Sequence, residues 1–141
     1  MAFSQNELFN RQLVLDLVRV LNPTYKVRFT TYKYARWDAT IFNPSGQIAY
    51  YIESKVRYCS STCFNSAIVD YPKAQLREKS KIAPVYVVSW YRRNNLVYLY
   101  PFADKGQLHS KLTLRQDRKF SLPFIFSQCY SYNNRVMTSL S

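Results

Sequence analysis

The sequence predicts an α/β fold in which helices flank a mixed β-sheet. Helical and strand periods follow one another in the order α-β-β-β-α-β-β, which favours that architecture. The chain has 141 residues, enough for one domain whose hydrophobic core needs no disulfide or metal. Hydrophobic residues make up 48% and aromatic residues 17%, which excludes disorder over most of the chain. We expect a single domain over residues 1–141, with its core in about 4–102.

The first helix is predicted over residues 4–21, where apolar residues recur at steps of three and four. Ser4 followed by Glu7 is a capping-box pattern that marks the beginning of this helix. Pro23 marks its end, because proline cannot continue a helix.

Five strands are predicted from runs of β-branched and aromatic residues. They lie at residues 25–32, 36–42, 47–56, 84–91 and 96–102. A turn with proline and glycine at 43–46 joins the second strand to the third. A polar turn at 92–95 joins the last two strands, so both pairs are expected to be hairpins.

The remaining segments carry weaker patterns. Residues 57–67 are polar and predict a loop, after which Asp70 can cap a second helix over 71–81. Farther on, residues 110–115 and 119–127 are compatible with short strands or with irregular cover. The last ten residues are expected to fray.

The chain is strongly basic, with 20 Lys and Arg against 8 Asp and Glu and a formal net charge of +12. Such a balance favours a polyanionic partner, and we expect Asp16 and Glu78 to be solvated surface charges. No apolar run approaches the ~20 residues of a membrane span. The N-terminus also lacks a signal-peptide pattern, so we expect no membrane partner and a cytoplasmic location. Three cysteines and one histidine, His109, argue against a disulfide framework, a zinc site and a Ser-His-Asp triad.

The hairpin of residues 36–56 gathers charged residues on one face. In the register that its turn favours, Asp38 faces Tyr51, and Glu53 is the diagonal neighbour of Asp38. Lys55 follows Glu53 on the same face, because strand side chains alternate with a period of two. The other face is apolar. A slip of one residue would place Asp38 and Glu53 on opposite faces.

Two carboxylates and an amine at this separation suggest metal-assisted chemistry. The carboxylates repel unless a cation or a proton lies between them. Hard oxygen ligands favour Mg²⁺, with Mn²⁺ as a substitute, and a bound metal can polarise a phosphoryl oxygen and activate water. A neighbouring lysine can orient that water or stabilise charge in the transition state. The alternative is a surface hairpin whose charged residues form cross-strand salt bridges.

Asp38, followed fifteen residues later by the triplet Glu53-Ser54-Lys55, resembles the motif of the PD-(D/E)xK nuclease superfamily. This superfamily includes Holliday-junction-resolvase-like and restriction-endonuclease-like proteins. The resemblance covers roughly residues 4–91 and includes the order of helices and strands. It implies a restriction-endonuclease-like αβββαβ core in which the aspartate lies on one strand and the triplet on the next.

The same resemblance implies metal-dependent hydrolysis of phosphodiester bonds. Asp38 and Glu53 would be metal ligands, together with the backbone carbonyl of Ser54. Lys55 would be the catalytic lysine. The chain departs from the motif at Trp37, which stands where the superfamily's name places a proline.

Both predicted helices offer further site residues. Glu7 matches the helix glutamate of Holliday-junction-resolvase-like members, although the capping box explains it equally well. The helix after the triplet supplies a site residue in many members, which indicates Gln75 first and Lys73 second; a solvated helix face is the alternative. Tyr32, Tyr34, Tyr51 and Tyr58 could stack on bases, but most of them are expected to be half-buried strand residues. The residues expected first to bind nucleic-acid phosphates are Lys73, Arg77, Arg57 and Arg36. Further basic residues near the site in the sequence, among them Lys79 and Arg92, are also interpreted as binding the substrate.

Together these residues predict a DNA endonuclease that uses Mg²⁺-activated water, with RNA as a less favoured substrate. A homodimer would suit the cutting of both strands. The length and basicity suit a bacterium or a phage-infected cell. The alternative is a non-catalytic nucleic-acid-binding protein on the same fold, such as a phage structural or packaging component.

Overall fold

In the computed structural model the chain is described over residues 5–30, 38–60, 66–70, 73–102, 119–123 and 128–140. The described helices are α1 (Gln5–Leu21) and α2 (Lys73–Ser80). The described strands are β1 (Lys26–Phe29), β2 (Asp38–Phe42), β3 (Ile48–Arg57), β4 (Ser66–Asp70), β5 (Val85–Tyr91), β6 (Leu96–Pro101), β7 (Lys119–Pro123), β8 (Gln128–Asn133) and β9 (Val136–Ser139). Neither of these helices is both long and apolar enough to cross a membrane.

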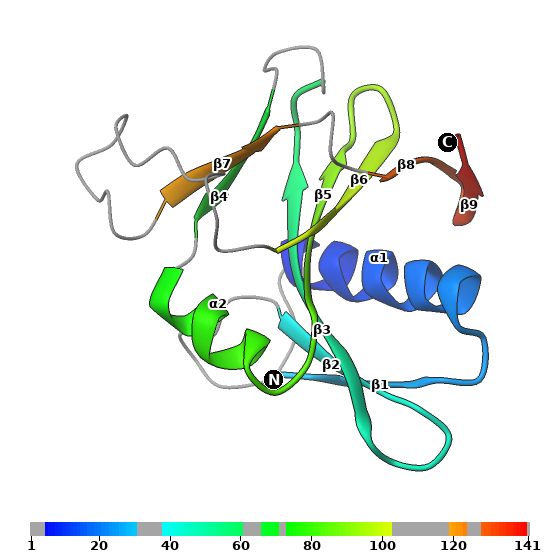
Figure 1. Ribbon diagram of the computed structural model, residues 1–141. Coiled ribbons are helices and arrows are strands. Elements are labelled where there is room, and N and C mark those ends of the chain that lie inside the picture. The colour runs from blue at the N-terminus through cyan, green and yellow to red at the C-terminus, as the bar shows by residue number, and fades with distance from the viewer. Residues whose placement is uncertain are drawn as a thin grey trace.

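Seven strands form one mixed sheet, in the order β1-β2-β3-β5-β6-β8-β9. Neighbouring strands are antiparallel except β3 and β5, which are parallel and are joined by a crossover that contains β4 and α2. β4 and β7 form a separate antiparallel pair. α1 lies on one side of the large sheet, whereas α2 and the β4–β7 pair lie on the other (Figure 1). The predicted mixed sheet with flanking helices is therefore confirmed.

The main core lies between α1 and the sheet. Four residues of α1 are buried in it: Leu13, Val14, Leu17 and Val18. Because side chains alternate along a strand, Ile52 of β3 faces this core, whereas Tyr51 faces the α2 side. A smaller core on the α2 side contains Leu76, Val87 and Tyr100.

The predicted helices and strands correspond to α1, α2, β1, β2, β3, β5 and β6, with ends that differ by a few residues. Asn95, in the predicted turn between β5 and β6, has a φ of 55°, which asparagine tolerates better than most residues. The loop predicted for residues 57–67 is wrong at its end, because Ser66 and Ala67 are the first residues of β4. A five-residue strand whose partner lies far along the chain leaves little local pattern to detect.

The prediction that the last ten residues fray is wrong. β8 and β9 form a hairpin that continues the large sheet beyond β6. Asn134 and Arg135 have φ values of 48° and 65°, as in the tight turns that match the twist of a hairpin. Tyr132 and Met137 of this hairpin are buried in the main core, which therefore extends past residue 102. Residues 110–115 and His109 lie outside the described residues.

Asp16 of α1 is a buried carboxylate, 3% exposed, and not the solvated surface charge that the sequence predicts. Arg135 donates to both of its oxygens, from Nε to Oδ2 at 3.0 Å and from Nη2 to Oδ1 at 2.9 Å. Tyr132 also donates to Oδ2, and Arg19 donates to Oδ1 at 3.3 Å. Burial acts to raise the pKa of Asp16, but these donors and charges outweigh it, so the pKa lies below its ordinary value. The C-terminal hairpin is thereby tied to α1.

Candidate active site

Strands β2 and β3 place Asp38 directly opposite Glu53. Thr40 lies opposite Tyr51, so the register differs by two residues from the predicted one, in which Asp38 faces Tyr51. Because side-chain direction has a period of two, a shift of two residues leaves Asp38, Glu53 and Lys55 on their predicted face. The shared face of Asp38 and Glu53 is therefore confirmed, although the side chain of Asp38 lies outside the described part. Lys55 follows on that same face.

Two local features of the hairpin produce this shift. The loop closes at Asn43, whose N–H donates to the Gln47 carbonyl at 2.9 Å. That closure is one residue later than the predicted pairing of Phe42 with Gln47. A bulge at Ala49, which has no partner on β2, shifts the register by one more residue. Gly46 supplies the φ of 84° that the loop requires.

Glu53 is a buried carboxylate, 5% exposed, on the α2 side of the sheet. The Nζ of Lys79, from α2, lies 2.7 Å from Glu53 Oε1. The same ammonium lies 5.6 Å from the centre of the Tyr51 ring. A buried carboxylate requires a counter-charge, and Lys79 supplies one. Because Tyr51 is itself buried beneath this pair, its suggested role in base stacking is wrong.

Helix α2 holds Lys79 over the sheet. Leu76 is completely buried and anchors the helix, and Lys79 follows three residues later on the same side of the helix. Gln75, Lys73 and Arg77 belong to this helix too, but their side chains lie outside the described part, so their roles stay predictions. The sequence associates Lys79 only with substrate binding and does not predict its pairing with Glu53. Its position one helical turn after Gln75 is the signal that could have found it.

Beyond Glu53, β3 carries two cationic residues on the same face, Lys55 and Arg57. Lys55 is exposed and lies beside Ser89 of β5 in the parallel register. Ser89 is 1% exposed, and its hydroxyl has no hydrogen-bond partner within the described ranges. Arg57 and Tyr91 are the next neighbours on this face. Burial raises the pKa of Tyr91 to about 12, against the lowering effect of the Arg57 charge.

The other predicted site residues lie elsewhere or outside the described ranges. Ser54 is half-buried, and its place between Glu53 and Lys55 directs its side chain to the α1 side of the sheet. Glu7 lies in the first turn of α1, whose buried residues pack on the opposite face of the sheet from Glu53. Its role as a metal ligand stays a prediction. Arg36 lies outside the described residues.

Asp38 and Glu53 are the residues predicted to supply hard oxygen ligands of the kind that Mg²⁺ prefers. In the structure, the Glu53 carboxylate contacts the ammonium of Lys79. The side chains that the structure describes, which do not include that of Asp38, contain no group of three or more His, Cys, Asp or Glu residues suited to a metal. Lys55 and Arg57 add cationic groups that suit a phosphate.

The chain matches no known protein-family model, no curated protein and no solved structure. Its function has to be inferred from its own residues and their arrangement.

Proposed function

We propose that the protein is a metal-dependent DNA endonuclease with a PD-(D/E)xK-like, restriction-endonuclease-like core. The observation that carries the proposal is the direct cross-strand pairing of Asp38 with Glu53, with Lys55 two residues farther on the same face. The topology supports it as well. The strand order β1-β2-β3-β5, in which only the last pair is parallel, has α1 and α2 on opposite sides, as the αβββαβ core requires (Figure 1).

Each residue of the proposed site has a distinct role. Asp38, Glu53 and the carbonyl of Ser54 would hold Mg²⁺ or Mn²⁺, which when bound would polarise the phosphate and activate water. Lys55 is exposed beside them, so its ammonium can reach a phosphate and stabilise the negative charge that develops during hydrolysis. Lys79 is a positioning residue that holds the Glu53 carboxylate in place through their 2.7 Å contact.

The charge of the molecule favours DNA as the substrate. The net charge of +12 attracts a polyanion without sequence preference. Arg57 lies two residues beyond Lys55 at the end of β3, and Arg92 follows the adjoining end of β5. These groups can hold the sugar–phosphate backbone while the acidic pair lies at the scissile bond.

Cleavage of defined DNA substrates tests the proposal. We expect linear, nicked or four-way-junction DNA to be cut in the presence of Mn²⁺ and left intact in EDTA. The Asp38→Asn variant should fold normally and lose about 10²-fold or more of the rate, because one hard oxygen ligand is removed. Wild-type protein that binds these DNAs but yields no product with either metal would contradict the proposal.

A second function is favoured by one specific contact. Lys79 forms an ion pair with Glu53, as expected of an acid retained for structural reasons. On this alternative the protein binds nucleic acid and does not cut it, as a structural or packaging component would. The same experiment separates the two functions, since binding without product would support the second.

A further inference from the structure

A second cationic site lies on the α1 side of the sheet, around Arg92. The Arg92 guanidinium lies 4.0 Å from the centre of the Phe9 ring, 5.6 Å from that of Trp90 and 5.7 Å from that of Tyr58. Aromatic faces hold a guanidinium in one plane by cation–π attraction and leave its N–H edges able to donate. In the part of the chain that the structure describes, the side chain of Arg93, the next residue, has no such rings around it and is exposed.

The Arg92 guanidinium opens onto a pocket of about 280 Å³, here called the Arg92 pocket. Apart from the Tyr132 hydroxyl, which donates to Asp16, its polar lining residues carry guanidinium and amide groups: Arg92, Arg135, Gln12, Asn95, Asn133 and Asn134. None of its lining residues is acidic. The nearby carboxylate of Asp16 is occupied by Arg135, Arg19 and Tyr132, so it neutralises Arg135 and not Arg92. Within the described ranges, Arg92 has no acidic partner.

Guanidinium and amide N–H groups around an acid-free pocket suit an anion with several acceptor oxygens. A planar guanidinium matches a phosphate through two parallel hydrogen bonds, and amide side chains can donate to the remaining oxygens. Such a pocket favours a phosphate over an apolar ligand, because an apolar ligand would bury these donors without partners.

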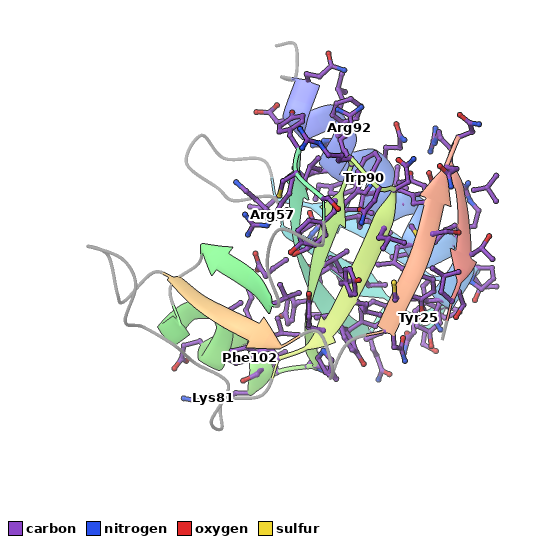
Figure 2. The ribbon with its side chains drawn as sticks, turned by 90° about the horizontal axis from the view of Figure 1, so that it is seen from above. Tyr25, Arg57, Lys81, Trp90, Arg92 and Phe102 are labelled. Carbon is purple, nitrogen blue, oxygen red and sulfur yellow. The ribbon has the colours of Figure 1, made fainter. Side chains whose placement is uncertain are left out.

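The Arg92 pocket is connected to the proposed active site through the ends of β3 and β5. The Arg92 N–H donates to the Arg57 carbonyl at 2.9 Å, so the two arginines are neighbours on opposite sides of the sheet end. Figure 2 shows Arg57, Trp90 and Arg92 close to one another. Arg57 lies four residues after Glu53 on β3, which corresponds to roughly 13 Å along an extended strand. A nucleic-acid strand can follow this path from the acidic pair over the sheet end.

We infer that the Arg92 pocket binds a backbone phosphate of the nucleic-acid strand, away from the scissile bond. The inference rests on the proposed function for the identity of the strand. It assigns to Arg92 a share of DNA affinity that its exposed neighbour Arg93 does not have, although both carry the same charge at the same sheet end.

Binding of a short fluorescein-labelled single-stranded DNA in EDTA, followed by fluorescence anisotropy at several salt concentrations, tests the inference. Arg92→Met keeps an unbranched stem against the rings and removes the guanidinium, and Arg93→Met is the matched control. We expect Arg92→Met to lower the affinity about tenfold and to reduce the slope of log affinity against log salt by about 0.7. The Arg93→Met variant should change the affinity by less than about twofold. Arg92→Lys should recover only part of the loss, because a point charge cannot replace the planar fork.

Equal losses from Arg92→Met and Arg93→Met, or no loss from Arg92→Met, would overturn the inference. If Arg92→Met does not fold, the comparison of Arg92→Lys with Arg93→Lys decides in the same way. Wild-type cleavage with Mn²⁺, measured in parallel, separates this inference from the proposed function. If the wild type cuts DNA but Arg92→Met binds it as tightly as the wild type, only the role of the Arg92 pocket is contradicted. If binding depends on Arg92 but the wild type does not cut, only the endonuclease activity is contradicted.

Discussion

At the scale of single residues, the Glu53–Lys79 pair is the feature on which the site depends. Glu53 is almost completely buried, and a carboxylate in that position is costly without a cation nearby. Lys79 reaches it from α2 at 2.7 Å. The pair fixes both the charge of Glu53 and the position of α2 over the sheet, so its removal should affect stability as well as chemistry.

Lys79→Met is expected to lower the free energy of unfolding by about 1–3 kcal/mol, because the buried Glu53 carboxylate would lose its 2.7 Å contact with an ammonium. The Lys79 side chain is 23% exposed, which keeps the loss below that of a fully buried pair. Urea unfolding measures the change, and Lys79→Met combined with Glu53→Gln should recover part of it. Lys81→Met is the control, since the Lys81–Glu78 pair is exposed. Equal losses from the two lysine variants would contradict the assigned role.

The lowered pKa of Asp16 predicts a dependence of stability on pH. Its folded-state pKa lies below the unfolded value, so its contribution is present above about pH 4 and is lost as the pH falls through the folded-state pKa. We expect Asp16→Asn to be less stable than the wild type at neutral pH, and the difference to narrow below about pH 4. Urea unfolding at neutral and acidic pH measures it. A difference that stays constant down to about pH 3 would show that Asp16 is not held as an anion.

At the scale of secondary-structure elements, the central hairpin shows what a sequence pattern can establish. The alternation of apolar and charged residues in β2 and β3 is enough to place Asp38 and Glu53 on one face. The register itself is not predictable from that pattern, because it depends on the loop closure at Asn43 and on the bulge at Ala49. Each feature shifts the register by one residue. The total shift is two, so Asp38 and Glu53 keep their predicted face although their predicted cross-strand partners are wrong.

The C-terminal hairpin shows the opposite case. Its strands are short and polar on one side, and its core residues, among them Tyr132 and Met137, are buried only because β6 and α1 lie beside them. The buried state of Asp16 cannot be predicted from α1 alone, since its partners lie more than a hundred residues later. Tertiary contacts of this kind leave no local pattern in the sequence.

The hydrogen bond from Tyr132 to Asp16 should stabilise the contact between α1 and the C-terminal hairpin. Tyr132→Phe removes a donor to a buried carboxylate and is expected to cost about 1–2 kcal/mol of unfolding free energy. Tyr130→Phe is the matched control on the same strand, because its hydroxyl bonds to the side chain of Gln128, which is exposed. Urea unfolding of both variants measures the difference. A larger loss from Tyr130→Phe would contradict the tie between α1 and this hairpin.

At the scale of the whole molecule, tyrosine is a main component of both cores. The chain contains 13 Tyr, and burial raises the pKa of Tyr50 and of Tyr91 to about 12. Their folded-state pKa values lie above the unfolded value of about 10, so the stability that they contribute as neutral phenols is complete below about pH 10. It is lost as the pH rises towards 12.

We therefore expect the urea midpoint of unfolding to fall steeply between about pH 10 and 11. Tyr50→Phe should be less stable than the wild type at neutral pH, because the bond from Tyr50 to Asn22 is lost, and should show a shallower fall at alkaline pH. Tyrosinate absorbance recorded along the same titration follows the phenols directly. Complete ionisation near pH 10 in a protein that stays folded would contradict the burial of these side chains.

The order of elements and the basic charge are both evident from the sequence. The order of elements predicts the α/β fold, and the basic charge is the basis for proposing a polyanionic partner. The proposed chemistry depends on a more specific arrangement of three side chains. Two acids must lie opposite each other, with an ammonium two residues beyond Glu53 able to reach the phosphate. Lys55 is the residue whose role separates catalysis from binding most sharply, because it is exposed and its removal leaves no buried charge.

Single-turnover cleavage of DNA with Mn²⁺, comparing Lys55→Ala with Lys81→Ala, is the most direct measurement. Both variants remove one exposed lysine and the same charge. If Lys55 stabilises the transition state, Lys55→Ala should cut about 10²–10³-fold more slowly, while Lys81→Ala should stay within about twofold of the wild type. Cleavage by Lys55→Ala at the wild-type rate would contradict the assignment of this face as an active site.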